Sequence, residues 1–229
     1  DTKFIGASPT ATSGTSTFSG TISVGVGSTA GIPALNINAP LGHQVDITGQ
    51  IAEVVGASDT SIGAIRKIGA GVVRLTNSNT YAGDTAVDEG TLLVDNSTGS
   101  GTGAGNVSVA LGAVLGGIGS TSGSVSLADD AVLMPSSATN SFDIGGALNI
   151  TSGAILDLQQ MTALNPLSTY TVVTYGSITG EFDPADIINV PVTHDVIVGT
   201  SSIQLIPVPE PTIALAGLLM TIPLIRRRR

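Results

Sequence analysis

The chain has 229 residues with no Cys, no Trp, four Phe and three Tyr, while 41% of its residues are hydrophobic and 30 are Gly. The lack of Cys excludes disulfides and thiol catalysis, and the scarcity of aromatic residues argues against one large globular core. Without the four arginines at 226–229, four cations face 17 acids, a balance of −13. Because such a surface repels nucleic acid and anionic lipid, no nucleic-acid partner is expected.

Residues 1–64 are rich in Gly, Ser and Thr and contain short stretches in which apolar and polar residues alternate. Alternation with a period of two between turn residues predicts strands, here over Thr17–Val26, Leu35–Ile37 and Val45–Ile47. No stretch before Thr212 has a convincing helical period. We therefore expect an N-terminal region of β-rich coils over residues 1–64.

A dense motif follows at residues 65–94, IRKIGAGVVRLTNSNTYAGDTAVDEGTLLV. It resembles the autotransporter-associated β-strand repeat of passenger domains. The matching positions are Lys67, Gly69, Gly71, Leu75, Asn79, Tyr81, Gly83, Thr85, Gly90, Thr91 and Leu92. The resemblance implies a right-handed parallel β-helix, and we expect passenger-type coils over residues 65–206.

Four stretches, the first of them at the end of this motif, share one pattern: a branched apolar residue, two spacers, Gly or Asp, a small residue and a second branched apolar residue. They begin at Val87, Val109, Leu127 and Ile150 and end at Leu92, Val114, Val132 and Ile155. A recurring period of about 20 residues is typical of a solenoid. The turn positions are Gly90, Gly112, Asp130 and Gly153, residue types that tolerate positive φ.

The stretch 170–205 resembles the last coils of such passengers. We therefore expect parallel strands to continue from Ile65 to Leu205.

Residues 207–229, PVPEPTIALAGLLMTIPLIRRRR, differ from the rest of the chain. Three prolines open the segment, Thr212–Ile225 carry no charge, and Arg226, Arg227, Arg228 and Arg229 follow. Placing four arginines at the centre of a bilayer would cost on the order of 10–14 kcal/mol, so the arginines should stay on the cytoplasmic side. Fourteen helical residues span only about 21 Å of the roughly 30 Å of hydrocarbon, which keeps a plain tail anchor or an interfacial helix open.

This segment resembles the PEP-CTERM sorting signal of Gram-negative bacteria, through Val208, Pro209, Glu210 and Pro211, the apolar run and the final arginines. The resemblance implies a short transmembrane helix and an exosortase partner, a membrane-embedded cysteine transpeptidase or protease that processes the chain near these residues. It also implies a single-pass intermediate in the inner membrane, then the cell surface or extracellular matrix, and a link to extracellular polysaccharide. An exported chain needs a leader, so a chain starting at Asp1 is expected to be a mature or truncated product.

Residues that could carry chemistry are few. Asp88–Glu89 and Asp129–Asp130 are carboxylate pairs, but both lie at the repeated turn, where we expect solvated acids. His43 and His194 are far apart in sequence and are expected to be exposed strand or loop residues, with no metal or triad site. Lys67 is expected to have a structural role within the repeat.

These patterns favour an exported, non-catalytic β-helix with a structural or adhesive role and no cofactor or metal. Two alternatives stay open: a β-helix polysaccharide lyase or hydrolase, and an unprocessed membrane-anchored adhesin. The enzyme needs a basic residue beside acids on one face, and three of the four cations outside 226–229 fall within Arg66–Arg74.

Overall fold

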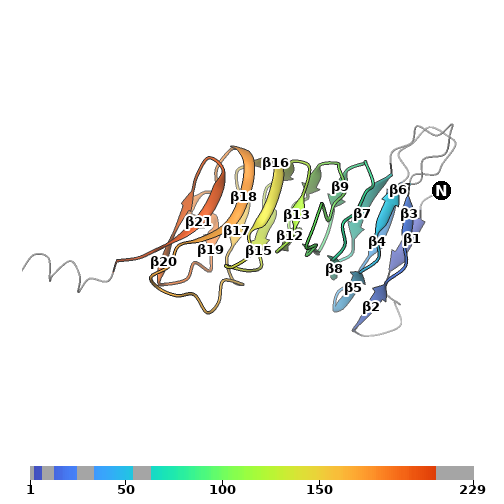
Figure 1. The fold of residues 1–229 in the computed structure, drawn as a ribbon, viewed down its shortest axis with the longest axis horizontal. Coiled ribbons are helices and arrows are strands. Elements are labelled where there is room, and N and C mark those ends of the chain that lie inside the picture. The colour runs from blue at the N-terminus through green and yellow to red at the C-terminus, as the bar shows by residue number, and fades with distance from the viewer. Residues whose placement is uncertain (1–2, 7–12, 25–33, 54–62, 210–229) are drawn as a thin grey trace, which may run out of the picture.

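Short strands stack along one axis and form two long sheets (Figure 1). The computed structural model describes residues 3–6, 13–24, 34–53 and 63–209. Each coil contributes one strand to each sheet, and parallel pairing joins successive coils. Sheet A has the order β1 (Lys3–Gly6), β4 (Ala34–Asn38), β7 (Ala64–Ile68), β9 (Thr85–Val87), β11 (Val107–Val109), β14 (Val125–Leu127), β16 (Phe142–Ile150), β18 (Tyr170–Thr179), β21 (Ser202–Pro207), β20 (His194–Val198), with β13 (Ser120–Thr121) beside β16.

Sheet B is parallel throughout and covers the other side of the stack. Its order is β2 (Gly14–Phe18), β5 (His43–Ile47), β8 (Val72–Leu75), β10 (Thr91–Val94), β12 (Val114–Gly117), β15 (Val132–Pro135), β17 (Ile155–Asp157), β19 (Ile187–Ile188). A third pair joins β3 (Ile22–Val24) to β6 (Ile51–Glu53), and a 3-10 helix covers Pro184–Asp186. The all-β, β-helix-like expectation is confirmed; the helix expected at Thr212–Ile225 lies outside the described residues.

The register of sheet A follows the spacing of the repeated apolar residues. Val87 pairs with Val109, Val109 with Leu127, and Leu127 with Ile150. The solenoid period inferred from these four residues is confirmed. At the following turns, Gly90, Gly112, Asp130 and Gly153 have φ values of 67, 71, 55 and 88°. A left-handed backbone lets the chain change direction between the sheets, and Gly or Asp adopts it with little steric cost.

The register of sheet B corrects the second half of the aligned pattern. Leu92 pairs with Leu115 rather than with Val114, because the turn between β9 and β10 is one residue shorter than the turns in later coils. Val114, Val132 and Ile155 therefore face outward and are only half-buried. The inward residues are Leu92, Leu115, Leu133 and Leu156, none of which is exposed.

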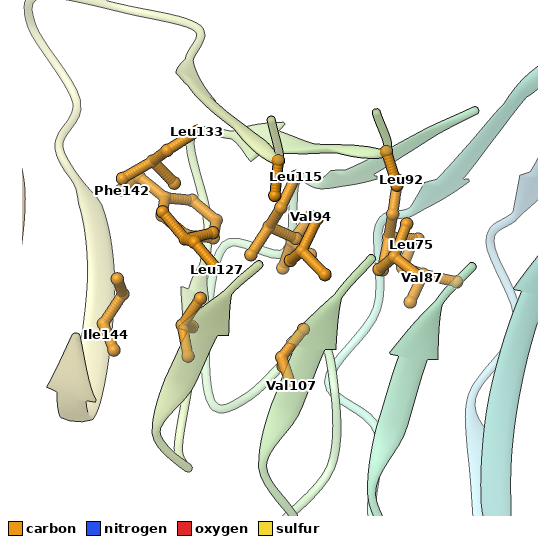
Figure 2. Packing of buried hydrophobic residues seen from close by; sticks show 14 of the residues in the cluster. Leu75, Val87, Leu92, Val94, Val107, Leu115, Leu127, Leu133, Phe142 and Ile144 are labelled. Atoms are coloured by element: carbon orange, nitrogen blue, oxygen red, sulfur yellow. The ribbon is translucent and has the colours of Figure 1, made fainter. Parts of the chain in front are cut away.

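The core is a stack of aliphatic residues between the two sheets (Figure 2). From sheet B it receives Leu75, Leu92, Leu115 and Leu133, and from sheet A it receives Val87, Val107, Leu127, Phe142 and Ile144. Each side chain packs on those of the coils before and after it. Burying a full side chain of this kind stabilises the fold by about 1.5–3 kcal/mol, so a narrow coil gains stability from each inward residue.

The expectation of parallel strands up to Leu205 is wrong for β20 and β21, although β19 still pairs in parallel with β17. β21 pairs with β18 and with β20 in antiparallel orientation. The reason is the connection between β20 and β21, which has only residues 199–201 and in which the Gly199 N–H donates to Ser202 O at 2.8 Å, as in a tight hairpin. A parallel return needs a crossover of a dozen or more residues. The hairpin thus covers the end of sheet A.

Candidate functional site

Segment 65–94 places the polar side chains of Lys67, Asn79 and Tyr81 inside the coils. The side chain of Lys67 points from β7 into the interior of the stack and has no exposed surface. Its Nζ donates to Glu89 O at 2.7 Å in the next coil, to Ile68 O at 3.2 Å and to Gly69 O. Burial lowers the pKa of Lys67 to about 8, while the Glu89 carboxylate acts in the opposite direction. An amine held by three carbonyls joins two coils and is not placed to act on a substrate.

Asn79 joins three successive coils. Its Oδ1 accepts a hydrogen bond from Ile51 N at 2.7 Å, and its Nδ2 donates to Gly101 O at 2.5 Å. The side chain is 5% exposed. A buried amide that satisfies backbone groups on both sides fixes their spacing, since leaving such groups unpaired costs about 1–3 kcal/mol.

Tyr81 is fully buried two residues later. Its hydroxyl shares a 2.6 Å hydrogen bond with Thr85 Oγ1, and burial raises the pKa of Tyr81. The phenol therefore fills the coil interior and stays protonated. Lys67, Asn79 and Tyr81 are all used in stacking the coils.

A column of side chains caps the backbone of the next coil at one corner. Asp84 Oδ1 accepts from Asn106 N at 2.8 Å, Asn106 Oδ1 from Ser124 N at 3.0 Å, and Ser124 Oγ from Ala147 N at 3.0 Å. Sequence reasoning missed this column. The signal was present, because the residues recur with the same spacing as Val87, Val109 and Leu127, three positions earlier in each coil.

The carboxylate pairs lie at the turns. Asp88 forms an ion pair with Arg66 of the preceding coil. A second ion pair, with Arg74 Nε 2.5 Å from Asp95 Oδ2, also links neighbouring coils. Asp129 and Asp130 are exposed. The structure does not bring the two carboxylate pairs together, since they belong to turns separated by an intervening coil.

The expectation that both histidines are exposed is wrong. His43 is 5% exposed and His194 is 2% exposed. His194 is held by the Thr193 hydroxyl at Nδ1, 2.8 Å, and by Ser168 O at Nε2, 2.9 Å. His43 points inward from β5, and neither ring nitrogen has a hydrogen-bond partner. The two lie near opposite ends of the stack, and the described residues contain no cluster of three His, Asp or Glu side chains suited to a metal ion.

Two shallow grooves lie on the surface of the described coils. One, of about 350 Å³, runs past Asp88, Ser108, Ser126 and Thr151. The other, of about 430 Å³, lies beside Gly14, Leu41 and Gly71. Asp88 is the single acid among the residues lining the first groove, and it is paired with Arg66.

The residues expected to form a sorting signal begin at the limit of the described chain. Val208 and Pro209 follow β21, and the Val208 N–H donates to Thr193 O at 2.9 Å. Glu210, Pro211, Arg226, Arg227, Arg228 and Arg229 lie outside the described residues. In the part of the chain that the structure describes, no helix has the length and apolar character needed to cross a membrane.

Comparison with known proteins gives one match. Residues 65–94 match the family model described as Passenger-associated-transport-repeat. The match supports the resemblance of this segment to the passenger repeat. No curated protein and no solved structure matches the chain. The match to a passenger-type repeat suggests an extracellular, exported surface protein built of β repeats. Within residues 65–94, the buried side chains of Lys67 and Asn79 hold neighbouring coils in register.

Proposed function

We propose that this chain is a non-catalytic structural or adhesive protein of the cell surface or extracellular matrix. The observation that carries the proposal is the use of the repeat's polar residues. Lys67, Asn79 and Tyr81 all bond within the stack, so the passenger-type segment builds a scaffold instead of a reaction centre. Its surface is then available for contact with a matrix component such as an extracellular polysaccharide. The right-handed winding of the coils stays a prediction of the family resemblance.

We propose further that residues 207–229 sort the protein. In this proposal the apolar run Thr212–Ile225 enters the inner membrane, the four arginines stay in the cytoplasm, and an exosortase processes the chain near Val208–Pro211. The support is the order of the three parts in the sequence and the position of Val208, which is 39% exposed and directly follows β21.

The sorting proposal predicts that Glu210→Ala blocks processing and leaves membrane insertion intact, because Glu210 adds nothing to membrane affinity. Membrane fractionation and the mass of the C-terminal peptide of the mature protein measure the two effects separately. Glu181→Ala, an exposed acid in the body of the chain, is the matched control and should be processed normally. Normal processing of the Glu210 variant would leave only a membrane anchor. Replacing Arg226–Arg229 by Ser should instead weaken the stop and release unanchored protein.

The enzyme alternative has one supporting feature, the groove beside Asp88. We predict that the purified protein releases neither sugars nor unsaturated products from acidic or neutral polysaccharides, because this acid is neutralised by Arg66 and lacks a second catalytic group in the groove. Product analysis by mass spectrometry measures this. Turnover that disappears in Asp88→Asn or Asp129→Asn, but persists in Asp195→Asn, would establish the enzyme instead.

A further inference from the structure

Exposed aliphatic side chains gather at one end of the stack. Leu167 is 78% exposed, Val192 is 97% exposed and Val208 is 39% exposed. They come from the loop before β18, the loop before β20 and the residue after β21. Figure 1 places β19, β20 and β21 at the end of the stack opposite β1.

Two hydrogen bonds hold these three segments together. His194 Nε2–H donates to Ser168 O at 2.9 Å, which ties the Leu167 loop to the Val192 loop. The Val208 N–H donates to Thr193 O at 2.9 Å, which ties the Val192 loop to the end of β21. Each aliphatic residue has a proline beside it, Pro166, Pro191 and the Pro207–Pro209 pair, so the loops are stiff.

The chemistry of this patch differs from that of the rest of the surface. Residues 158–170, 187–194 and 203–209 contain no Asp, Glu, Lys or Arg, although the chain outside 226–229 has a balance of −13. Elsewhere in the described residues, the most exposed aliphatic side chains, Leu41 and Leu111, each occupy a separate turn between sheets A and B. An uncharged apolar patch on an acidic protein marks a contact surface.

The position of the patch identifies its occupant. Two residues, Glu210 and Pro211, separate Pro209 from the apolar run that starts at Thr212. Three residue steps reach at most about 11 Å. This inference rests on the proposed membrane insertion of residues 212–225. With that run in a bilayer, the short proline-rich link holds Leu167, Val192 and Val208 at the membrane surface.

We propose that this patch, Leu167, Val192 and Val208, rests on the bilayer surface while the apolar run is inserted. The aliphatic side chains enter the interfacial region, as in other peripheral contacts where apolar area leaves water. The absence of charge in these loops avoids a desolvation cost. The contact orients the long axis of the stack away from the membrane and holds the Val208–Pro211 segment at a fixed height.

The natural absence of Cys permits a direct test in the full chain. Four single-cysteine variants each carry one environment-sensitive fluorophore: Leu167→Cys, Val192→Cys, Leu41→Cys and Ala216→Cys. Each labelled protein is reconstituted in phosphatidylcholine vesicles, and brominated phosphatidylcholine serves as the quencher. Leu41 is a matched control because its exposure equals that of Leu167, 78%, and it lies toward the opposite end of the stack. We expect strong quenching at 216, clear quenching at 167 and 192, and none at 41.

The outcomes separate the two proposals. Quenching at 216 without quenching at 167 and 192 overturns the surface contact and leaves membrane insertion standing. No quenching at 216 overturns insertion, and the contact falls with it. A fluorescence change at 167 and 192 that depends on protein density, without lipid quenching, assigns the patch to a second copy of the chain and also overturns the proposal.

A second set of variants tests the contact without relying on the label position. With the fluorophore at Thr193→Cys, the pair Leu167→Asp and Val192→Asp should remove the quenching, since carboxylates do not enter the interface. Leu41→Asp should leave it unchanged. Circular dichroism checks that all variants stay folded; retained quenching in the folded double variant overturns the proposal.

Discussion

Two glycines with the same backbone conformation show how much packing adds to conformational strain at a single residue. Gly90 and Gly112 have φ values of 67 and 71°. A Cβ at Gly90 would lie 2.5 Å from both Gly69 O and Gly71 O and 2.7 Å from Lys67 Nζ, whereas a Cβ at Gly112 would have no atom within 4 Å. We expect Gly112→Ala to cost about 1 kcal/mol of unfolding free energy and Gly90→Ala roughly 2–4 kcal/mol. Urea unfolding measures both, and equal costs would mean that the coils relax around the new side chain.

The buried titratable groups predict an unusual alkaline stability profile. Because burial lowers the pKa of Lys67 from 10.5 to about 8, the unfolded chain binds more protons than the folded chain between those values. Stability should therefore rise with pH through this window, by about 1–3 kcal/mol. Burial raises the pKa of Tyr81 and of Tyr175 above 10.0, so above that pH the unfolded chain loses protons that the folded chain retains, and stability should fall.

Urea unfolding across the alkaline range tests this profile, with a stability maximum expected near pH 10. Lys67→Met should flatten the rise and leave the fall. Tyr81→Phe should leave the rise and reduce the fall, with the remaining fall due to Tyr175. A profile in Lys67→Met that still rises as in the natural chain would show that another group titrates in this window.

The strands show which features of the fold the sequence specifies. The spacing of Val87, Val109 and Leu127 predicts the register of sheet A because each strand is reached after a similar turn. The register of sheet B could not be read the same way, since Leu92 and Leu93 are both apolar and only the shorter turn at Gly90 decides which one faces inward. The antiparallel end follows from the brief Gly199–Ser201 connection, a signal that was available in the sequence.

The candidate site shows a different limit of sequence reasoning. The structural role of Lys67 could be anticipated from its place in the repeat, but its carbonyl partner Glu89 O belongs to the next coil. The burial of His194 depends on Ser168 O, 26 residues earlier, and no local pattern predicts that pairing. Side chains whose partners are in the neighbouring coil become interpretable only after the register is known.

The whole molecule is close to one-dimensional, since each coil pairs with the coil before it and the coil after it. Stability in such a stack is approximately a sum of coil terms and interface terms. Val109 and Leu127 occupy equivalent positions in successive coils, so residues 110–127 amount to one complete coil. Removing them would place Leu133 on Leu92, the same kind of pair that it makes with Leu115 now.

We therefore predict that the chain lacking residues 110–127 still folds with one cooperative transition and a smaller m-value, because less surface is exposed on unfolding. Removing only residues 110–118 is the control. It takes out half a coil, so every later strand would reach the wrong sheet and turn its inward residues to solvent. Circular dichroism and urea unfolding compare the two. If the half-coil variant were as stable as the whole-coil variant, the fold would tolerate a change of register. The stacking of Val87 on Val109 and of Leu92 on Leu115 would then not be what holds the coils together.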